Sequence, residues 1–175
     1  MFNPKYVTIG KDVKHIEFKN DYIIKEFKNK KYYNNTLEFY KYFNNDFIPK
    51  LIDYDNKKIT IKQECVGNLL SLKTNLPNDW KKQFKNMEKF FIKNNIFIED
   101  IRFLPYTPLV INNLTVKNNK IYLVDLTMYN YRSRKYIKKK FKKLIENIEF
   151  YLNNLELFPF TFILLYHIIT FFYFI

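Results

Sequence analysis

Five polar residues that could together act on a phosphate group occur in order along the chain, namely Lys25, Glu38, Asp100, Asn113 and Asp125. Transfer of a phosphoryl group needs a positive charge on the nucleotide phosphates, oxygen ligands for a metal ion, and a carboxylate near the acceptor hydroxyl. Lys25 lies inside the apolar stretch Tyr22–Phe27, and Glu38 follows it on a predicted helix. The chain therefore offers one candidate for each of these roles.

Asp125 is the most informative of the five. It ends the apolar run Ile121–Val124, where a carboxylate is costly unless it is paired or used. Asn113 precedes it by twelve residues, a spacing that suits a loop, a hairpin and a second loop. Asp100 ends another apolar stretch, Ile96–Ile98 followed by Glu99.

The elements that must position these side chains follow from apolar periodicity and turn residues. Extended stretches are predicted at Tyr6–Ile9, Val13–Phe18, Tyr22–Phe27, Leu51–Tyr54, Lys58–Gln63, Ile96–Ile101, Leu114–Val116 and Ile121–Val124. Helices are predicted at Asn34–Phe43, capped by Asn35 or Thr36, at Asp79–Asn94 and at Ser133–Asn153, and a Pro-containing loop at Phe103–Pro108. This mixture predicts an α+β fold.

With these elements in this order, the chain resembles the protein-kinase-like superfamily, including its choline and aminoglycoside kinases. The resemblance covers about residues 5–132 and rests on six features in order: Tyr22–Phe27, Glu38, Phe47–Tyr54, Gln63–Leu70, Asn95–Ile101 and Ile121–Leu126. It implies a small antiparallel-sheet N-lobe with one helix and a reduced helical C-lobe. The expected division is 1–67 for the β-rich part, 68–156 for the helical part and 157–175 for an apolar tail.

The resemblance also implies that ATP and Mg²⁺ are the cofactors, and it gives each matched residue a role. Those roles are nucleotide binding for Lys25, Glu38 and Gly67, with Glu38 holding Lys25; catalysis for Asp100; and magnesium binding for Asn113 and Asp125.

Several departures from the family pattern weaken the expectation of activity. A Gly-rich phosphate loop is missing, because Ile9–His15 contains only Gly10, and close backbone approach to phosphate is easiest at glycine. Ile98 stands where the family has a catalytic-loop histidine, and eight extra residues separate Asp100 from Asn113. The sequence therefore predicts a pseudokinase or a weak ATP- and magnesium-dependent phosphotransferase, and whether the chain is an active enzyme stays open.

Ordinary interpretations of the same residues stay open as well. Lys25 could be a solvated strand lysine, Glu38 exposed helix surface, and Asp100 a loop or cap residue. Asn113 could be a turn residue in a chain rich in asparagine. Only their spatial convergence distinguishes a site from a scatter of such residues.

The charge of the chain says little about its partners. Lys and Arg number 30 against 17 Asp and Glu, a net charge of +13, but only three of the 30 are arginine. An AT-rich genome inflates lysine, and readers of nucleic acid lean on the rigid fork of arginine. Nucleic-acid binding is therefore the least favoured function. Cys65 is the only cysteine, which excludes an intramolecular disulfide and fits an intracellular location.

Two C-terminal segments suggest an alternative function. The segment Arg132–Lys143 consists mostly of lysine and arginine, and could be a solvated helix face or a surface for anionic lipid. Residues 157–175 carry no formally charged side chain and equal roughly one bilayer thickness as a helix of about 1.5 Å per residue. They could anchor the chain in a membrane or form a buried helix. The alternative is thus a non-catalytic membrane-associated or scaffold protein.

Overall fold

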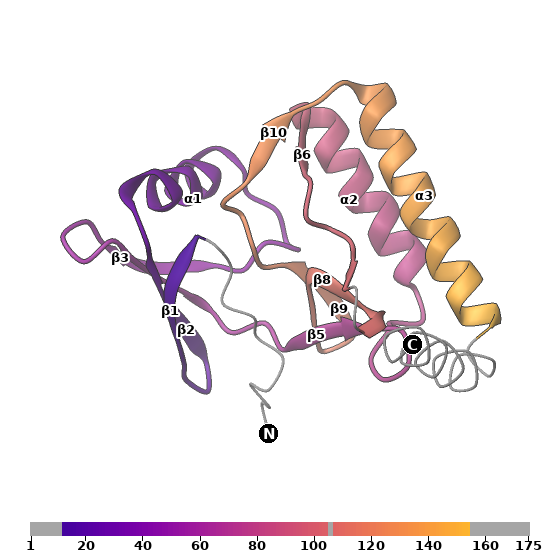
Figure 1. The fold of residues 1–175 in the computed structure, drawn as a ribbon, viewed down its shortest axis with the longest axis horizontal. Coiled ribbons are helices and arrows are strands. Elements are labelled where there is room, and N and C mark those ends of the chain that lie inside the picture. The colour runs from indigo at the N-terminus through magenta and orange to yellow at the C-terminus, as the bar shows by residue number, and fades with distance from the viewer. Residues whose placement is uncertain (1–11, 105–106, 155–175) are drawn as a thin grey trace, which may run out of the picture.

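A computed structural model describes residues 12–104 and 107–154, which form small antiparallel sheets and three helices. The α+β class predicted from the sequence is confirmed. A sheet with one helix forms one end of the molecule, two long helices form the other end, and a second sheet lies between them (Figure 1).

The first sheet has four antiparallel strands in the order β1-β2-β4-β3. Their bounds are Val13–Phe18 for β1, Tyr22–Phe27 for β2, Leu51–Asp55 for β3 and Thr60–Glu64 for β4. The first two strands have the predicted bounds. In β2, Lys25 pairs with Ile16 on one side and with Ile61 on the other, so it lies in the middle of the sheet.

Helix α1, Lys30–Tyr42, begins four residues before the predicted Asn34. The reason is its cap, because the side chain of Asn29 accepts a hydrogen bond from the backbone N–H of Tyr32 at 3.2 Å. The buried face of the helix is formed by Tyr33, Thr36 and Phe39, at the spacing of successive turns.

The second sheet is built around the long strand β8, Thr107–Lys117. It pairs with β5 (Asn68–Ser71), β7 (Phe103–Leu104) and β9 (Lys120–Leu123). The prediction of a loop over Phe103–Pro108 is wrong at both ends, because β7 and the start of β8 pair as strands. A separate two-stranded ribbon joins β6 (Ile96–Ile98) to β10 (Tyr129–Tyr131).

Helices α2, Trp80–Asn94, and α3, Arg134–Asn153, lie side by side (Figure 1). The rings of Phe91 and Phe141 meet across them, with centroids 5.7 Å apart. Both helices have nearly the predicted bounds. α2 ends at Asn95 in the left-handed conformation, and the side chain of Ser133 caps α3.

The hydrophobic core consists of two clusters of buried residues. The smaller cluster lies under the first sheet and includes Phe27, Tyr33 and Ile61. The larger cluster is built mainly from the second sheet, α2 and α3, but it also takes in Phe39 of α1. The ring of Phe39 lies 5.4 Å from that of Tyr129 in β10, so α1 connects the two parts.

Some predicted features lie outside the described residues. These are the strand Tyr6–Ile9, Gly10 and the apolar tail 157–175. Among the residues that the structure describes, no helix is both long and apolar enough to cross a membrane.

Candidate functional site

Lys25 points from the first sheet toward the second. Ile23, Lys25 and Phe27 lie on the same face of β2, and Ile23 and Phe27 are buried. The side chain of Lys25 therefore leaves β2 on the buried face. Its ammonium donates a hydrogen bond to the carbonyl oxygen of Val124 at 2.6 Å. Burial lowers the pKa of Lys25, and the negative charges of Asp125 and Asp12 partly oppose that effect. The lysine is therefore not a solvated strand residue.

Asp125 is held in a turn directly after β9. Its Oδ1 accepts a hydrogen bond from the backbone N–H of Thr127 at 3.2 Å and another from the Thr127 hydroxyl. This is the Asx-turn pattern, in which an aspartate side chain bonds the backbone two residues further on. The turn fixes the carboxylate beside the ammonium of Lys25.

Asp12 is a second carboxylate at the same place. It is buried, and its Oδ2 also accepts from the hydroxyl of Thr127. A hydroxyl carries one proton, so Thr127 can donate to only one of the two carboxylates at a time. We call Asp12, Lys25, Asp125 and Thr127 the interlobe cluster. With both carboxylates ionised, its formal charge is −1, and a cation would stabilise it.

Asn113 lies next to this cluster in β8. Its backbone carbonyl accepts from the N–H of Val124 at 3.0 Å, and Val124 is the residue whose own carbonyl holds Lys25. The side-chain amide of Asn113 points at the carbonyl oxygen of Asp100, at 3.5 Å. Asn113 has a φ of 62°, a left-handed conformation that asparagine tolerates better than most residues.

Asp100 is close to Asn113 through its backbone, but its side chain is more open. The carboxylate is 43% exposed and lies 3.7 Å from the guanidinium of Arg102. The main chain of Asp100 therefore lies next to Asn113, one of the two predicted metal ligands. The carboxylate of Asp100 is half in solvent and lies near Arg102.

Glu38 is not brought to Lys25. It is exposed on α1, and no ion pair joins the two among residues 12–104 and 107–154. Burial raises the pKa of Tyr129, and the charge of Glu38 adds to that effect, which locates this carboxylate near β10. The α1 residue that reaches the site is Asn35, whose amide donates to the Thr127 carbonyl at 3.3 Å.

Gly67, predicted to bind nucleotide, is required by packing. It lies between β4 and β5 with a φ of 85°, and a Cβ placed there would come 2.0 Å from the carbonyl oxygen of Val116. Only glycine allows this conformation and this approach of two backbones. The stretch around Gly67 is held further by Lys117, whose ammonium donates to the Cys65 carbonyl at 2.7 Å.

The donor chemistry of the site suits Mg²⁺. Magnesium prefers oxygen ligands and usually takes one or two carboxylates, completing its shell with water and phosphate. Asp125 offers a carboxylate, and Asn113 an amide oxygen on the neighbouring strand. Within the described residues no group of three or more His, Cys, Asp or Glu could hold a metal ion. Protein side chains would thus supply only part of the shell.

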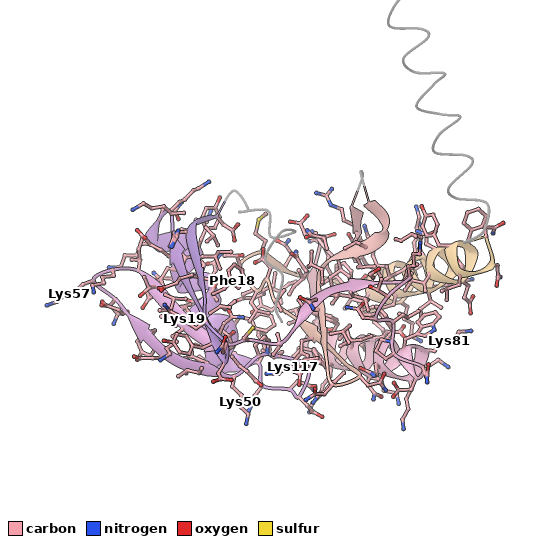
Figure 2. The ribbon with its side chains drawn as sticks, turned by 90° about the horizontal axis from the view of Figure 1, so that it is seen from below. Phe18, Lys19, Lys50, Lys57, Lys81 and Lys117 are labelled. Atoms are coloured by element: carbon pink, nitrogen blue, oxygen red, sulfur yellow. The ribbon has the colours of Figure 1, made fainter. Side chains whose placement is uncertain are left out.

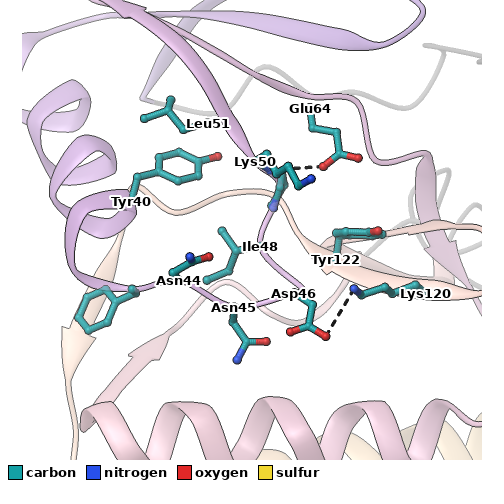
Figure 3. Close-up of a pocket in the computed structure, with 12 residues that line it drawn as sticks. Tyr40, Asn44, Asn45, Asp46, Ile48, Lys50, Leu51, Glu64, Lys120 and Tyr122 are labelled. Atoms are coloured by element: carbon teal, nitrogen blue, oxygen red, sulfur yellow. Dashed lines mark hydrogen bonds and ion pairs between the residues drawn. The ribbon is translucent and has the colours of Figure 1, made fainter.

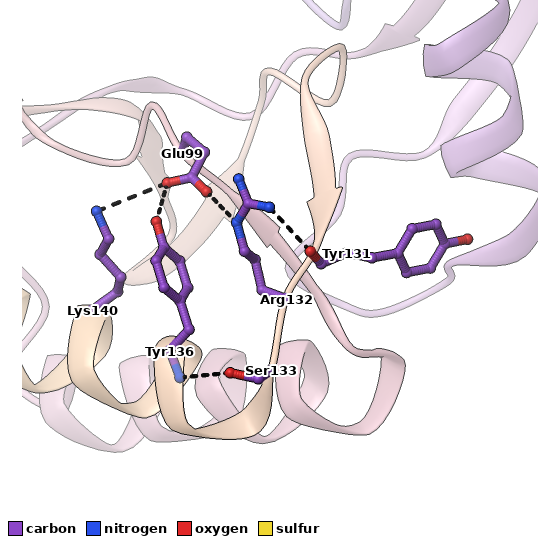
Figure 4. A network of polar contacts seen from close by, with 6 residues as sticks. All are labelled: Glu99, Tyr131, Arg132, Ser133, Tyr136 and Lys140. Carbon is purple, nitrogen blue, oxygen red and sulfur yellow. Dashed lines mark hydrogen bonds and ion pairs between the residues drawn. The ribbon is translucent and has the colours of Figure 1, made fainter.

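Glu99 has the most extensive polar contacts near the site among the described residues, and no sequence pattern indicated this role. Its carboxylate accepts from Arg132 Nε at 2.7 Å and from the Tyr136 hydroxyl at 2.6 Å, and Lys140 Nζ lies 3.8 Å away (Figure 4). Burial raises the pKa of Glu99, but the two hydrogen bonds and the nearby cations hold it below its ordinary value. The network ties the residue before Asp100 to the start of α3.

A wide cavity lies away from the interlobe cluster. It has a volume of about 910 Å³ and lies between the end of α1, the start of β3 and β9 (Figure 3). Its lining includes Tyr40 and an ion pair of Asp46 with Lys120 at 3.7 Å. None of the predicted site residues lines it, so this cavity is not the site that the sequence indicated.

Comparison with known proteins adds no family to this geometry. Models of known protein families match no part of the chain, and no curated protein matches it in sequence. The interpretation of the site therefore depends on its own residues and on the order of its elements.

Proposed function

We propose that the chain is a divergent protein-kinase-like protein that binds ATP and Mg²⁺ at the interlobe cluster, as a pseudokinase or a weak phosphotransferase. The hydrogen bond from Lys25 to the Val124 carbonyl carries this proposal. It brings a strand lysine to the residue before Asp125, and a phosphate site needs a lysine and a metal-binding carboxylate close to one another.

The neighbours of that hydrogen bond support the same proposal. Asn113 contacts Val124 through its backbone, and Asp100 contacts Asn113. Lys25 would bind the phosphates, while Asp125 and Asn113 would hold Mg²⁺, which offsets phosphate charge when bound. The half-exposed carboxylate of Asp100 is the candidate to orient an acceptor hydroxyl.

Two features favour weak turnover or none. Asp12 contributes a negative charge that acts on Lys25, and it opposes the approach of phosphate there. Glu38 does not hold Lys25, so the orientation of the lysine depends on the Val124 carbonyl alone among its hydrogen bonds in the described residues. A scaffold that binds nucleotide without catalysis fits these features, and it is the second form of the proposal.

Thermal unfolding with and without Mg-ATP tests the proposal. The expected result is a rise in Tm for the wild type that is lost in Lys25→Met, because ligand that binds only the folded state stabilises it. The matched control is Lys62→Met on the neighbouring strand β4, which should keep the full rise. An equal rise in both variants, or no rise in the wild type at millimolar Mg-ATP, would refute nucleotide binding at Lys25.

A further inference from the structure

The first half of α3 presents a dense cationic surface. Its members are exposed and belong to one stretch of the helix, namely Arg134, Lys135, Lys138, Lys139, Lys142 and Lys143. At about 100° per residue they cover roughly half of the helix circumference. The buried residues Ile137, Phe141 and Leu144 occupy the opposite side. We call these six residues the α3 cationic face.

Acidic residues do not balance this face. In the part of the chain that the structure describes, only Lys142 of the six has an ion-pair partner, Glu146, at 3.7 Å. Lysines elsewhere are paired more often, as Lys14 is with Glu26 at 2.6 Å and Lys19 with Glu17 at 2.7 Å. Figure 2 labels lysines of other elements, with Lys57 and Lys81 at opposite ends of the molecule. The α3 cationic face is thus a local excess of charge.

A hollow beside this face combines charge with apolar surface. It has a volume of about 320 Å³ and is lined by the cations Arg102, Lys140 and Lys143. The carboxylate of Glu99 also lines it and lies 3.8 Å from Lys140, which leaves three cations against one carboxylate in the lining. Apolar side chains also line it, including Phe97 and Leu144. Cations beside an apolar lining suit an amphiphilic anion whose phosphate lies at the cations.

We infer that the α3 cationic face docks on an anionic phospholipid surface. Clusters of four to eight lysines and arginines on an amphipathic helix typically bind such surfaces, with about 1 kcal/mol per cation near the lipid, that is, about fivefold in affinity. The sequence after α3 agrees, because residues 157–175 contain no charged side chain. This inference does not depend on nucleotide binding at the interlobe cluster.

Nucleic acid is the competing anionic partner, and the face is less suited to it. Six cations include only one arginine, whereas arginine gives the bidentate phosphate and base contacts. The nearby aromatic side chains Phe97 and Phe141 are buried, so they offer no stacking platform for bases.

Flotation of the full chain with lipid vesicles tests this inference. The probes are neutral phosphatidylcholine vesicles and vesicles that also contain about 30% phosphatidylserine. The measured quantity is the ratio of the two partition coefficients, which isolates the charge-dependent binding from any binding through the apolar tail. The variant is the triple change Lys135→Gln, Lys138→Gln and Lys139→Gln. The matched control is Lys82→Gln, Lys85→Gln and Lys89→Gln on the exposed side of α2.

The α3 triple should lower the ratio about 100-fold, since each cation contributes about fivefold. The α2 triple should change it less than about threefold, although it removes the same net charge. Equal effects of the two triples would overturn the inference, as would a ratio near one for the wild type. Single-stranded RNA that displaces the chain from anionic vesicles and binds through the same three lysines would overturn it too, by making the face a nucleic-acid surface.

Discussion

Lys25 in β2 and Val124 after β9 are 99 residues apart in sequence, and their ammonium and carbonyl groups lie 2.6 Å apart. This hydrogen bond crosses from the first sheet to the second. It leaves the ammonium next to Asp125, whose charge favours the protonated lysine. A lysine under the influence of the negative charges of Asp125 and Asp12 can attract a phosphate only if that local negative charge is offset.

Asp12 should therefore weaken nucleotide binding. Its carboxylate lies beside Lys25, and a like charge a few ångströms from a phosphate costs about 1–4 kcal/mol, depending on the local dielectric. The change Asp12→Asn keeps an oxygen acceptor for Thr127 and should tighten ATP binding about tenfold, measured by calorimetric titration. Asp21→Asn, at an exposed turn, is the control and should have no effect. Weaker binding by Asp12→Asn would instead make Asp12 a metal ligand.

Asn113 can be tested without straining its backbone. Glycine readily adopts the φ of 62° found there, so Asn113→Gly removes the side chain and preserves the conformation. We expect the ratio of the ATP affinities with and without Mg²⁺ to fall about tenfold in Asn113→Gly, while the Tm changes by only a few degrees. The control is Asn118→Gly, also at positive φ but in the exposed β8–β9 turn. If both variants bind Mg-ATP equally well, Asn113 has only a backbone role.

A substitution at Gly67 distinguishes a role in packing from a role in nucleotide binding. Gly67→Ala should lower the free energy of unfolding by at least about 2 kcal/mol, because the new Cβ meets the Val116 carbonyl at 2.0 Å in a left-handed backbone. Denaturant unfolding measures this loss, with Asn68→Ala at the exposed next residue as the control. An unchanged free energy of unfolding together with lost ATP binding would restore the nucleotide role that the sequence suggested.

The Glu99 network predicts a pH-dependent stability. The pKa of Glu99 is lowered in the folded protein. The carboxylate therefore contributes to the free energy of unfolding above the ordinary glutamate pKa, and this contribution is lost as the pH falls through the pKa of Glu99 in the folded protein. Tyr136→Phe removes the 2.6 Å hydrogen bond and should cost about 1–2 kcal/mol at neutral pH. The cost should shrink at acid pH, once the pH has fallen below the folded pKa of Glu99 and the carboxyl is protonated. Urea unfolding at both pH values checks this.

The exposed Tyr131→Phe serves as the control for that experiment, since its side chain is 73% exposed. It should not change the stability at either pH. A Tyr136→Phe cost that is the same at both pH values would mean that packing of the ring, not the Glu99 hydrogen bond, stabilises the start of α3.

Local patterns predicted the elements that carry strong local signals. Runs rich in β-branched and aromatic residues predicted β1 and β2 with their correct bounds, and apolar residues at helical spacing predicted α2 and α3. The short strand β10 was missed because its pairing with β6 lies far away in sequence. Phe103–Pro108 was predicted as a loop because its strands form through the pairing of β7 with β8, which no local sequence pattern indicates.

The site was predicted in part, for related reasons. Lys25 lies within an apolar run and Asp125 follows one. A polar group in such a place is costly to bury unless it has a partner, so both positions indicated a site. Asp12 and Thr127 gave no such signal, because their contact spans 115 residues. The Asx-turn spacing from Asp125 to Thr127 was a usable local clue. Glu38 was chosen by family spacing, whereas the register of α1 directs Asn35 to the site.

Calorimetric titration of ATP with Mg²⁺ and with EDTA tests whether Lys25 and Asp125 form one ATP–magnesium site. For the wild type we predict tighter binding with Mg²⁺. Asp125→Asn should remove most of the magnesium dependence, and Lys25→Met should weaken binding about tenfold or more under both conditions, because it removes the phosphate partner. The exposed Asp53→Asn in β3 should behave as the wild type. ATP binding that does not depend on magnesium in any variant, or that is unchanged in both Asp125→Asn and Lys25→Met, would show that these two residues do not form an ATP–magnesium site.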